Sequence, residues 1–200
     1  MAESFGNVGT VQLLWSMVGL LLTMGGTFLE AYGIALPSSL STQGIQTFSL
    51  GVTCQVGAVL LVGCLGGKNA GALSQIAYLV MGLTLLPVFA EGGGIGYVKL
   101  SQFGYLLGFI PGAWICGFLA FKARPKLETL AFSCVSGLFT VHLCGITYLI
   151  ISYIFQWKGT ENLALMQAIL RYSWLALPGQ LAVVCAVTVI AYILRHLMFY

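Results

Sequence analysis

The sequence predicts an all-α integral membrane protein, with residues 1–200 forming a single transmembrane domain of six transmembrane helices. Hydrophobic residues make up 59% of the chain and charged residues only 6%, whereas a soluble domain carries about 25% charged residues. The apolar segments are long and continuous, without the alternating polarity of the strands in a membrane β-barrel. At about 20 residues per span, a chain of 200 residues has room for six helices.

Six apolar segments account for the predicted helices in order. The first is too long for the core of a signal peptide and lacks a basic leader, so we expect it to be retained as a helix. A Gly-Gly-Lys-Asn turn at 66–69 separates the second from the third, and a short amphipathic stretch at 162–172 precedes the sixth. The segments cover about 11–29, 48–65, 70–90, 104–121, 129–155 and 175–197.

The distribution of lysine and arginine predicts the orientation, because cytoplasmic loops carry an excess of these residues. With six spans both termini lie on one side, which collects Lys68, Lys122, Arg124, Lys126 and Arg195. The other side has only Lys99, Lys158 and Arg171. We therefore expect a multi-pass protein of the plasma membrane with both termini in the cytoplasm. Its surroundings are the lipid bilayer, and no basic field is present to bind nucleic acid.

Few residues are suited to catalysis or metal binding. The chain has no aspartate, only two histidines, and five glutamates that lie outside the spans or at their ends. The turn at 66–69 lacks both the first glycine and the Ser/Thr of a phosphate-binding loop. The six cysteines are scattered without metal-binding spacing, and we expect them to pack as small hydrophobic residues. We therefore expect no enzymatic activity, no catalytic residue, no metal and no cofactor.

Polar, uncharged side chains within the spans are the most informative residues. A buried amide or hydroxyl without a partner costs roughly 2–7 kcal/mol, so each of these groups must face another helix or a polar cavity. Ser74 and Tyr78 lie four residues apart and therefore share one helix face. Such groups either join helices by hydrogen bonds or line a cavity for a neutral small molecule. A cavity indicates a solute carrier more than an ion channel, which uses charged rings or carbonyl filters. The polar residues include Gln55, Ser74, Tyr78, His142 and Gln180.

Several motifs make this pattern specific. Thr53-Cys54-Gln55 is followed by Gly-Lys-Asn-Ala-Gly-Ala-Leu-Ser at 67–74, by Pro-Val-Phe-Ala at 87–90, and by Gly-Tyr-Leu-Leu-Gly-Phe-Ile-Pro at 104–111. In their order and spacing these motifs resemble the BioY family, the biotin-specific membrane subunit (S component) of energy-coupling-factor transporters. The clear match covers about residues 52–117, and a weaker one reaches Gly145 and the Leu-Pro-Gly-Gln segment at 177–180.

The resemblance implies an S-component-like bundle that captures biotin from the outer side for uptake across the plasma membrane. It also implies an optional partnership with a transmembrane coupling subunit and two cytoplasmic ATPases. The first helix lacks the alanine-rich coupling face of the family, and Gly19 and Thr23 are a candidate substitute.

The resemblance and the polar pattern together predict a substrate site. We expect the biotin head to contact Gln55, Ser74, Tyr78 and Gln180, and we expect Arg171 either to hold the tail carboxylate or to anchor a helix end at the lipid headgroups. The family carries aspartate and lysine where this chain has Gln180 and Val183. Two alternatives therefore stay open, a transporter of the same fold for another vitamin-like solute and a structural subunit of a membrane complex.

Overall fold

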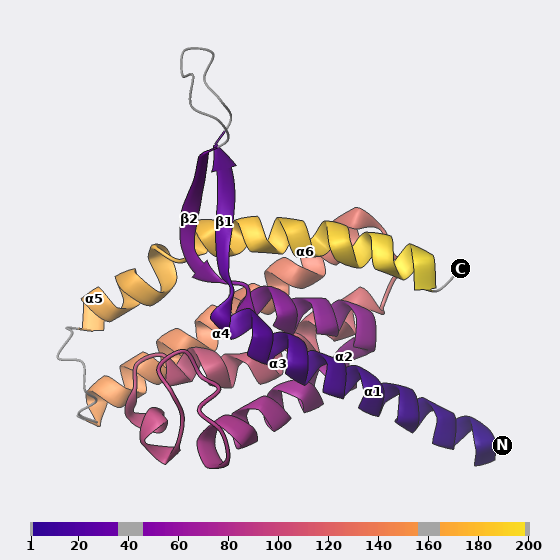
Figure 1. Ribbon diagram of the computed structural model, residues 1–200, viewed down its shortest axis with the longest axis horizontal. Coiled ribbons are helices and arrows are strands. Elements are labelled where there is room, and N and C mark those ends of the chain that lie inside the picture. The colour runs from indigo at the N-terminus through magenta and orange to yellow at the C-terminus, as the bar shows by residue number, and fades with distance from the viewer. Residues whose placement is uncertain (1, 36–45, 156–164, 199–200) are drawn as a thin grey trace.

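Five long helices form a bundle in the computed structural model of the protein, which describes residues 2–35, 46–155 and 165–198 (Figure 1). Each belongs to a helical segment long and apolar enough to cross a membrane. The last of them follows the short helix α5 (Leu165–Ile169) and the π-helical turn η2 (Leu170–Trp174). The five helices are α1 (Ala2–Phe28), α2 (Gln55–Thr84), α3 (Phe103–Ala120), α4 (Leu127–Ile154) and α6 (Leu177–Met198).

Helix α2 consists of two arms joined at Gly67. This residue has φ 80° and ψ 178°, a backbone conformation that glycine adopts readily and other residues do not. The arms, 55–66 and 68–84, fold back on each other. The close approach is seen at Gly71, where an added Cβ would lie 3.3 Å from the Cα of Gly63. The predicted turn at 66–69 is confirmed, and the predicted six-helix bundle is seen as five helices with six helical arms.

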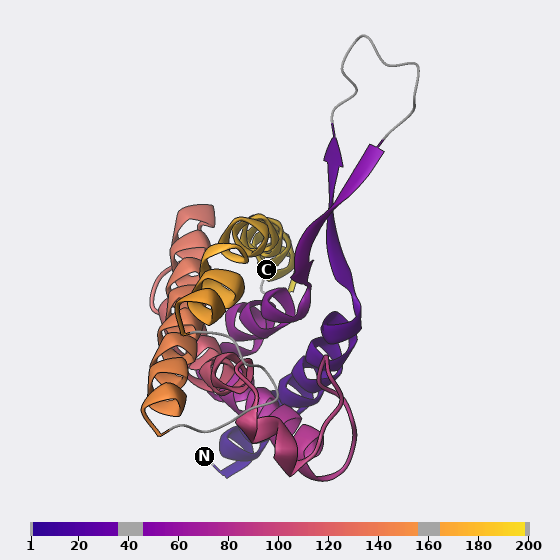
Figure 2. The same cartoon turned by 90° about the vertical axis from the view of Figure 1, so that its left-hand side faces the viewer.

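A two-stranded hairpin, which the sequence did not predict, follows α1. Strands β1 (Glu30–Ala35) and β2 (Gln46–Thr53) pair antiparallel, with Tyr32 opposite Ser49. Figures 1 and 2 show the hairpin projecting from the side of the bundle. The prediction that the second helix begins near residue 48 was wrong, because the strand continues to Thr53 and the helix begins at Gln55. Apolar residues at 48, 50 and 52 alternate with small or polar ones, which is the two-residue period of a strand.

Apolar side chains cover the outside of the bundle and several polar ones lie inside it. Phe132 and Phe139 of α4 are 65% and 68% exposed, whereas Thr23, Ser74 and Gln75 are fully buried. A soluble monomer rarely exposes an apolar surface of this extent. Together with the five membrane-length segments, this distribution identifies a multi-pass membrane protein.

Gly19 and Thr23 of α1 lie in the interface between α1 and α2. A Cβ added at Gly19 would lie 2.8 Å from the Cβ of Ser74, and the hydroxyl of Thr23 accepts a hydrogen bond of 3.0 Å from Gln75. The expectation that Gly19 and Thr23 substitute for a coupling face was therefore wrong. Both residues are occupied by contacts within the chain.

The basic residues gather at two ends of the bundle. The start of α1 and the end of α6 lie at the same end (Figure 1). One cavity is lined by Lys68 and Lys122, and another by Arg124 and Lys126 beside the last turns of α6. Arg171 lies beside the start of α6 at the opposite end, and Lys158 is outside the described residues. Which end faces the cytoplasm stays a prediction.

Candidate functional site

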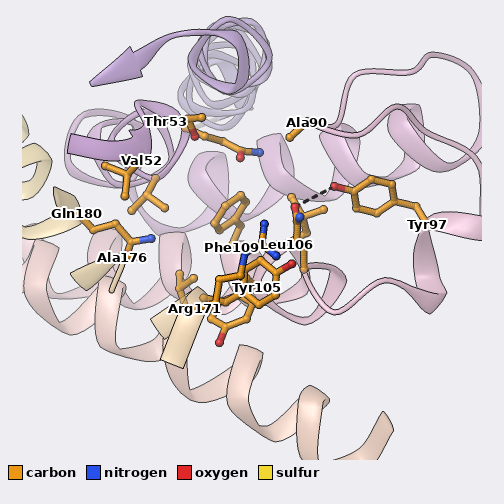
Figure 3. Close-up of a pocket in the computed structure, with 16 residues that line it drawn as sticks. Val52, Thr53, Ala90, Tyr97, Tyr105, Leu106, Phe109, Arg171, Ala176 and Gln180 are labelled. Atoms are coloured by element: carbon orange, nitrogen blue, oxygen red, sulfur yellow. Dashed lines mark hydrogen bonds between the residues drawn. The ribbon is translucent and has the colours of Figure 1, made fainter. Parts of the chain in front are cut away.

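A cavity of about 310 Å³ lies at the end of the bundle where α1 stops and α2, α3 and α6 begin (Figure 3). Binding pockets for small molecules occupy about 300–1,000 Å³, so this cavity is large enough for one such molecule. Its apolar wall comprises Val52, Val56, Ala90, Leu106, Phe109, Val141 and Ala176. Its polar lining comprises Thr53, Gln55, Tyr97, Gln102, Tyr105, Arg171, Tyr172 and Gln180.

Gln180, on the first turn of α6, is held by a chain of hydrogen bonds from neighbouring helices. Its Oε1 lies 2.6 Å from Nε2 of His142 on α4. The other ring nitrogen of His142 lies 3.2 Å from Oγ of Ser173, and that oxygen lies 2.7 Å from the hydroxyl of Tyr105 on α3. In Figure 3 the amide nitrogen of Gln180 points into the cavity. Three helical elements thus fix one amide of the lining.

Gln55, the first residue of α2, is held in a similar way by Tyr78 from behind. Its Nε2 donates a hydrogen bond of 3.0 Å to the Tyr78 hydroxyl. Tyr78 donates in turn to the carbonyl oxygen of Val88 at 3.0 Å and contacts the hydroxyl of Thr27 at 3.1 Å. Tyr78 is fully buried and is not among the residues that line the cavity. Its position makes it a support for Gln55.

Ser74 lies away from the cavity. Its hydroxyl donates a hydrogen bond of 2.7 Å to the carbonyl oxygen of Gly71 and accepts one of 3.0 Å from Gln75. Ser74 and Tyr78 do share one helix face, but that face contacts Gly19 and Thr27 of α1. The structure therefore brings Gln55, Gln180 and Arg171 together around one cavity, places Tyr78 behind Gln55, and places Ser74 in the interface between α1 and α2.

Arg171, on η2, is the only lysine or arginine among the described residues that line the cavity. Its guanidinium lies over the ring of Tyr172, 5.5 Å from the centroid. Val183 of α6 is buried against α2, since one of its methyl groups would lie 2.7 Å from a Cβ at Gly57. The cation at this cavity therefore comes from η2 and not from α6.

Five polar lining residues were not predicted as site residues from the sequence: Thr53, Tyr97, Gln102, Tyr105 and Tyr172. Burial raises the pKa of Tyr97 above its usual range, and the charge of Glu91 raises it further. The phenol therefore stays protonated and donates to Oε1 of Gln102 at 3.4 Å, while Gln102 donates to Glu91 at 2.6 Å. Only Thr53 and Tyr105 had a signal in the sequence, because each belongs to one of the motifs at 53–55 and 104–111.

Three of the six cysteines converge in the bundle, although they are far apart in the sequence. The sulfur of Cys64 lies 3.6 Å from that of Cys116 and 3.5 Å from that of Cys134, and all three residues are buried. The three sulfurs therefore meet in space, although the cysteines lack metal-binding spacing along the sequence. The three come from α2, α3 and α4, so sequence spacing gave no sign of their proximity. Cysteine sulfurs are ligands for soft metal ions, and none of the three cysteines lines the cavity.

Comparison with known proteins decides the family. The model described as the BioY family matches residues 11–199. The chain belongs to the BioY family. The resemblance seen in its motifs is confirmed.

Individual relatives agree with this assignment. The chain is 37% identical over 101 residues to the probable biotin transporter BioY of Lysinibacillus sphaericus, covering 50% of this chain and 52% of that protein. It is 39% identical over 95 residues to the biotin transporter BioY of Thermotoga maritima, covering 47% and 56%. The matches thus span about half the length of these two BioY proteins. A match of 24% over 186 residues covers 93% of this chain and 95% of an uncharacterized 21.2 kDa protein of Cyanophora paradoxa.

A solved structure shares the fold of this BioY-family chain. It is the crystal structure of the S-component for biotin from an ECF-type ABC transporter, and the two superpose with a TM-score of 0.66. The alignment covers 98% of this chain and 94% of the other at 18% identity. The S-component-like bundle predicted from the sequence is thereby confirmed.

Proposed function

We propose that this BioY-family protein captures biotin in the 310 Å³ cavity and takes part in biotin uptake across the plasma membrane. One observation carries the proposal: the amides of Gln55 and Gln180 and the guanidinium of Arg171, from α2, α6 and η2, line one cavity together with a largely apolar wall. Biotin has the matching groups, namely a ureido head with a carbonyl and two N–H groups, an apolar thioether ring and a carboxylate tail.

The amides of Gln55 and Gln180 offer hydrogen-bonding groups that complement the ureido head. Gln55 uses its Nε2 on Tyr78, which leaves its carbonyl oxygen for a ureido N–H. The apolar ring of biotin fits against Leu106 and Phe109. Leaving a buried polar group unpaired costs about 1–3 kcal/mol, so each amide contributes about tenfold or more in affinity.

Arg171 supplies the positive charge for the tail. A carboxylate that enters a membrane cavity loses hydration and needs a cation or a strong donor nearby. A guanidinium holds a carboxylate through two parallel hydrogen bonds. The alternative role of Arg171 is to anchor η2 at the lipid headgroups. That role requires no contact with biotin.

In this proposal the cavity opens to the outer side of the membrane and both termini lie in the cytoplasm. The clustering of Lys68, Lys122, Arg124 and Lys126 at the opposite end supports this orientation. The protein works alone or with a transmembrane coupling subunit and two cytoplasmic ATPases. Biotin uptake by cells that express this chain with and without such a module separates the two modes.

The ligand is tested by competition among vitamins. The purified protein in detergent is loaded with radiolabelled biotin and challenged with a panel of other vitamins. We expect unlabelled biotin alone to displace the label at low concentration. A transporter of another vitamin-like solute is the second candidate, because Gln180 and Val183 replace the charged residues of the family. Tighter binding of another vitamin would establish that candidate, and binding of none would favour a structural subunit.

A further inference from the structure

We propose that His142 fixes the amide of Gln180 so that its N–H₂ group faces the ligand, and that this group recognises the ureido carbonyl oxygen of biotin. The proposal rests on biotin being the ligand. It assigns to His142 the role of a positioning residue and to Gln180 the role of a hydrogen-bond donor toward the ligand.

The direction of the hydrogen bonds follows from the atoms that take part. Oε1 of Gln180 can only accept, so Nε2 of His142, 2.6 Å away, carries the proton. In a neutral imidazole the other nitrogen then accepts, and Ser173 donates to it at 3.2 Å. The hydroxyl of Tyr105 donates to Ser173 at 2.7 Å. Every bond from Tyr105 to Gln180 therefore runs in the same direction.

Packing holds the residues of this hydrogen-bond chain in place. His142 and Ser173 are each only 6% exposed, and the ring of Tyr105 packs edge-on against His142 at 5.8 Å. Reversing the amide would require the proton of His142 to move to its other ring nitrogen and the His142–Ser173 hydrogen bond to reverse with it. Turning the Gln180 amide alone would leave its N–H₂ group facing the N–H of His142, a buried donor against a donor, which costs more than either complete arrangement.

The consequence is a defined pattern of donors and acceptors at the cavity. Gln180 presents two N–H donors, Arg171 presents guanidinium donors, and Gln55 presents its carbonyl oxygen, since its Nε2 is bound to Tyr78. An aspartate in place of Gln180 could only accept from a ligand. This cavity therefore selects ligands that offer an acceptor toward α6 and a donor toward α2.

The probe for this polarity is 2-iminobiotin, in which a protonated imino group replaces the ureido oxygen at neutral pH. Its guanidinium-like head, like that of arginine, has donors and no acceptor. We expect the wild-type protein to bind biotin about tenfold or more tighter than 2-iminobiotin. His142→Ala frees the Gln180 amide to turn and should shrink this preference. His142→Gln keeps an N–H donor toward Oε1 of Gln180 and should restore it.

Gln180→Glu tests the site itself, because a carboxylate only accepts, and we expect this variant to prefer 2-iminobiotin. His196→Ala, which removes a histidine near the other end of α6, serves as the control and should keep the wild-type preference. A His142→Ala variant with the full wild-type preference, or a Gln180→Glu variant that still prefers biotin, would overturn the inference. If His142→Ala fails to fold, a wild-type protein that binds both ligands equally overturns it too. Absence of biotin binding by the wild type would instead overturn the proposed function.

Discussion

At the scale of single residues, Ser74 and Tyr78 lie one helical turn apart but have different neighbours. Tyr78→Phe removes the acceptor for the amide of Gln55, so we expect biotin affinity to fall about tenfold. Ser74→Ala removes a hydrogen bond to a carbonyl of its own helix and should leave the affinity unchanged. Isothermal titration calorimetry on the purified variants measures both. An equal loss of biotin affinity in both variants would show that Ser74 contributes to the binding site.

Arg171 is tested with a ligand that lacks the charge. We expect Arg171→Ala to weaken binding of biotin by about tenfold or more, and to weaken binding of an uncharged biotin amide much less. Lys99→Ala is the matched control, because Lys99 is an exposed cation of the short helix η1 (Ile95–Lys99) that is not part of the cavity lining. Equal losses for biotin and its amide, or none, would show that Arg171 only anchors η2.

The sequence revealed part of the site because a polar side chain in an apolar helix needs a partner. That rule identifies Gln55 and Gln180 but cannot say whether the partner is a ligand or another helix. Ser74 shows the limit, because its neighbour is Gly19 of α1, which is 55 positions away in the chain. Tyrosines such as Tyr97 and Tyr172 lie near helix ends, where this residue commonly sits at the membrane interface, so their contact with a cavity was not predictable.

At the scale of elements, Gly67 sets the turn between the two arms of α2. Gly67→Ala should lower the stability by about 1–3 kcal/mol, because its backbone conformation is essentially restricted to glycine. Steric overlap is not the cause, since the nearest atom to an added Cβ is 3.6 Å away, on Phe121. Thermal unfolding in detergent should show a lower midpoint.

Gly25→Ala provides the control for that measurement. Gly25 is in the helical part of α1, and nothing lies within 4 Å of an added Cβ. Alanine there should stabilise the protein by about 0.4–1 kcal/mol through the unfolded state. A Gly67→Ala variant as stable as Gly25→Ala would mean that the turn does not depend on glycine.

The hairpin shows why hydropathy alone mislocates an element. Residues 48–65 form one continuous apolar segment by composition, but its first part pairs with β1 and its remainder forms α2. Pairing depends on a partner strand that begins at Glu30. Hydropathy averaged over a short stretch of sequence contains no information about that partner. The Gly-Gly-Lys-Asn turn was predictable because its signal is local.

At the scale of the whole molecule, the two ends of the bundle should face different compartments. Single cysteines replace Lys126 and Lys99 in a chain whose native cysteines have been removed. An impermeant thiol reagent should label position 99 in intact cells and position 126 only after the cells are opened, because the end richer in lysine and arginine faces the cytoplasm. Labelling of position 126 but not 99 in intact cells would invert the topology.

The bundle as a whole was predictable because its composition admits few alternatives. With 6% charged residues, the chain must place its apolar side chains toward lipid, and small residues then let the helices approach closely. The convergence of Cys64, Cys116 and Cys134 was not predictable, because it depends on the packing of three helices whose relative rotation no local pattern encodes.

The central claim is that biotin occupies the cavity at the start of α6, and blocking that cavity tests it most directly. Calorimetric titration with biotin compares the wild type, Ala176→Phe and Ala182→Phe, all purified in detergent. Ala176 lines the cavity, whereas Ala182 is exposed on α6. We predict that the wild type and Ala182→Phe bind one biotin per chain with the same affinity, and that Ala176→Phe binds at least about tenfold more weakly. A wild type that does not bind biotin, or an Ala176→Phe variant that binds it as tightly as the wild type, would contradict the account.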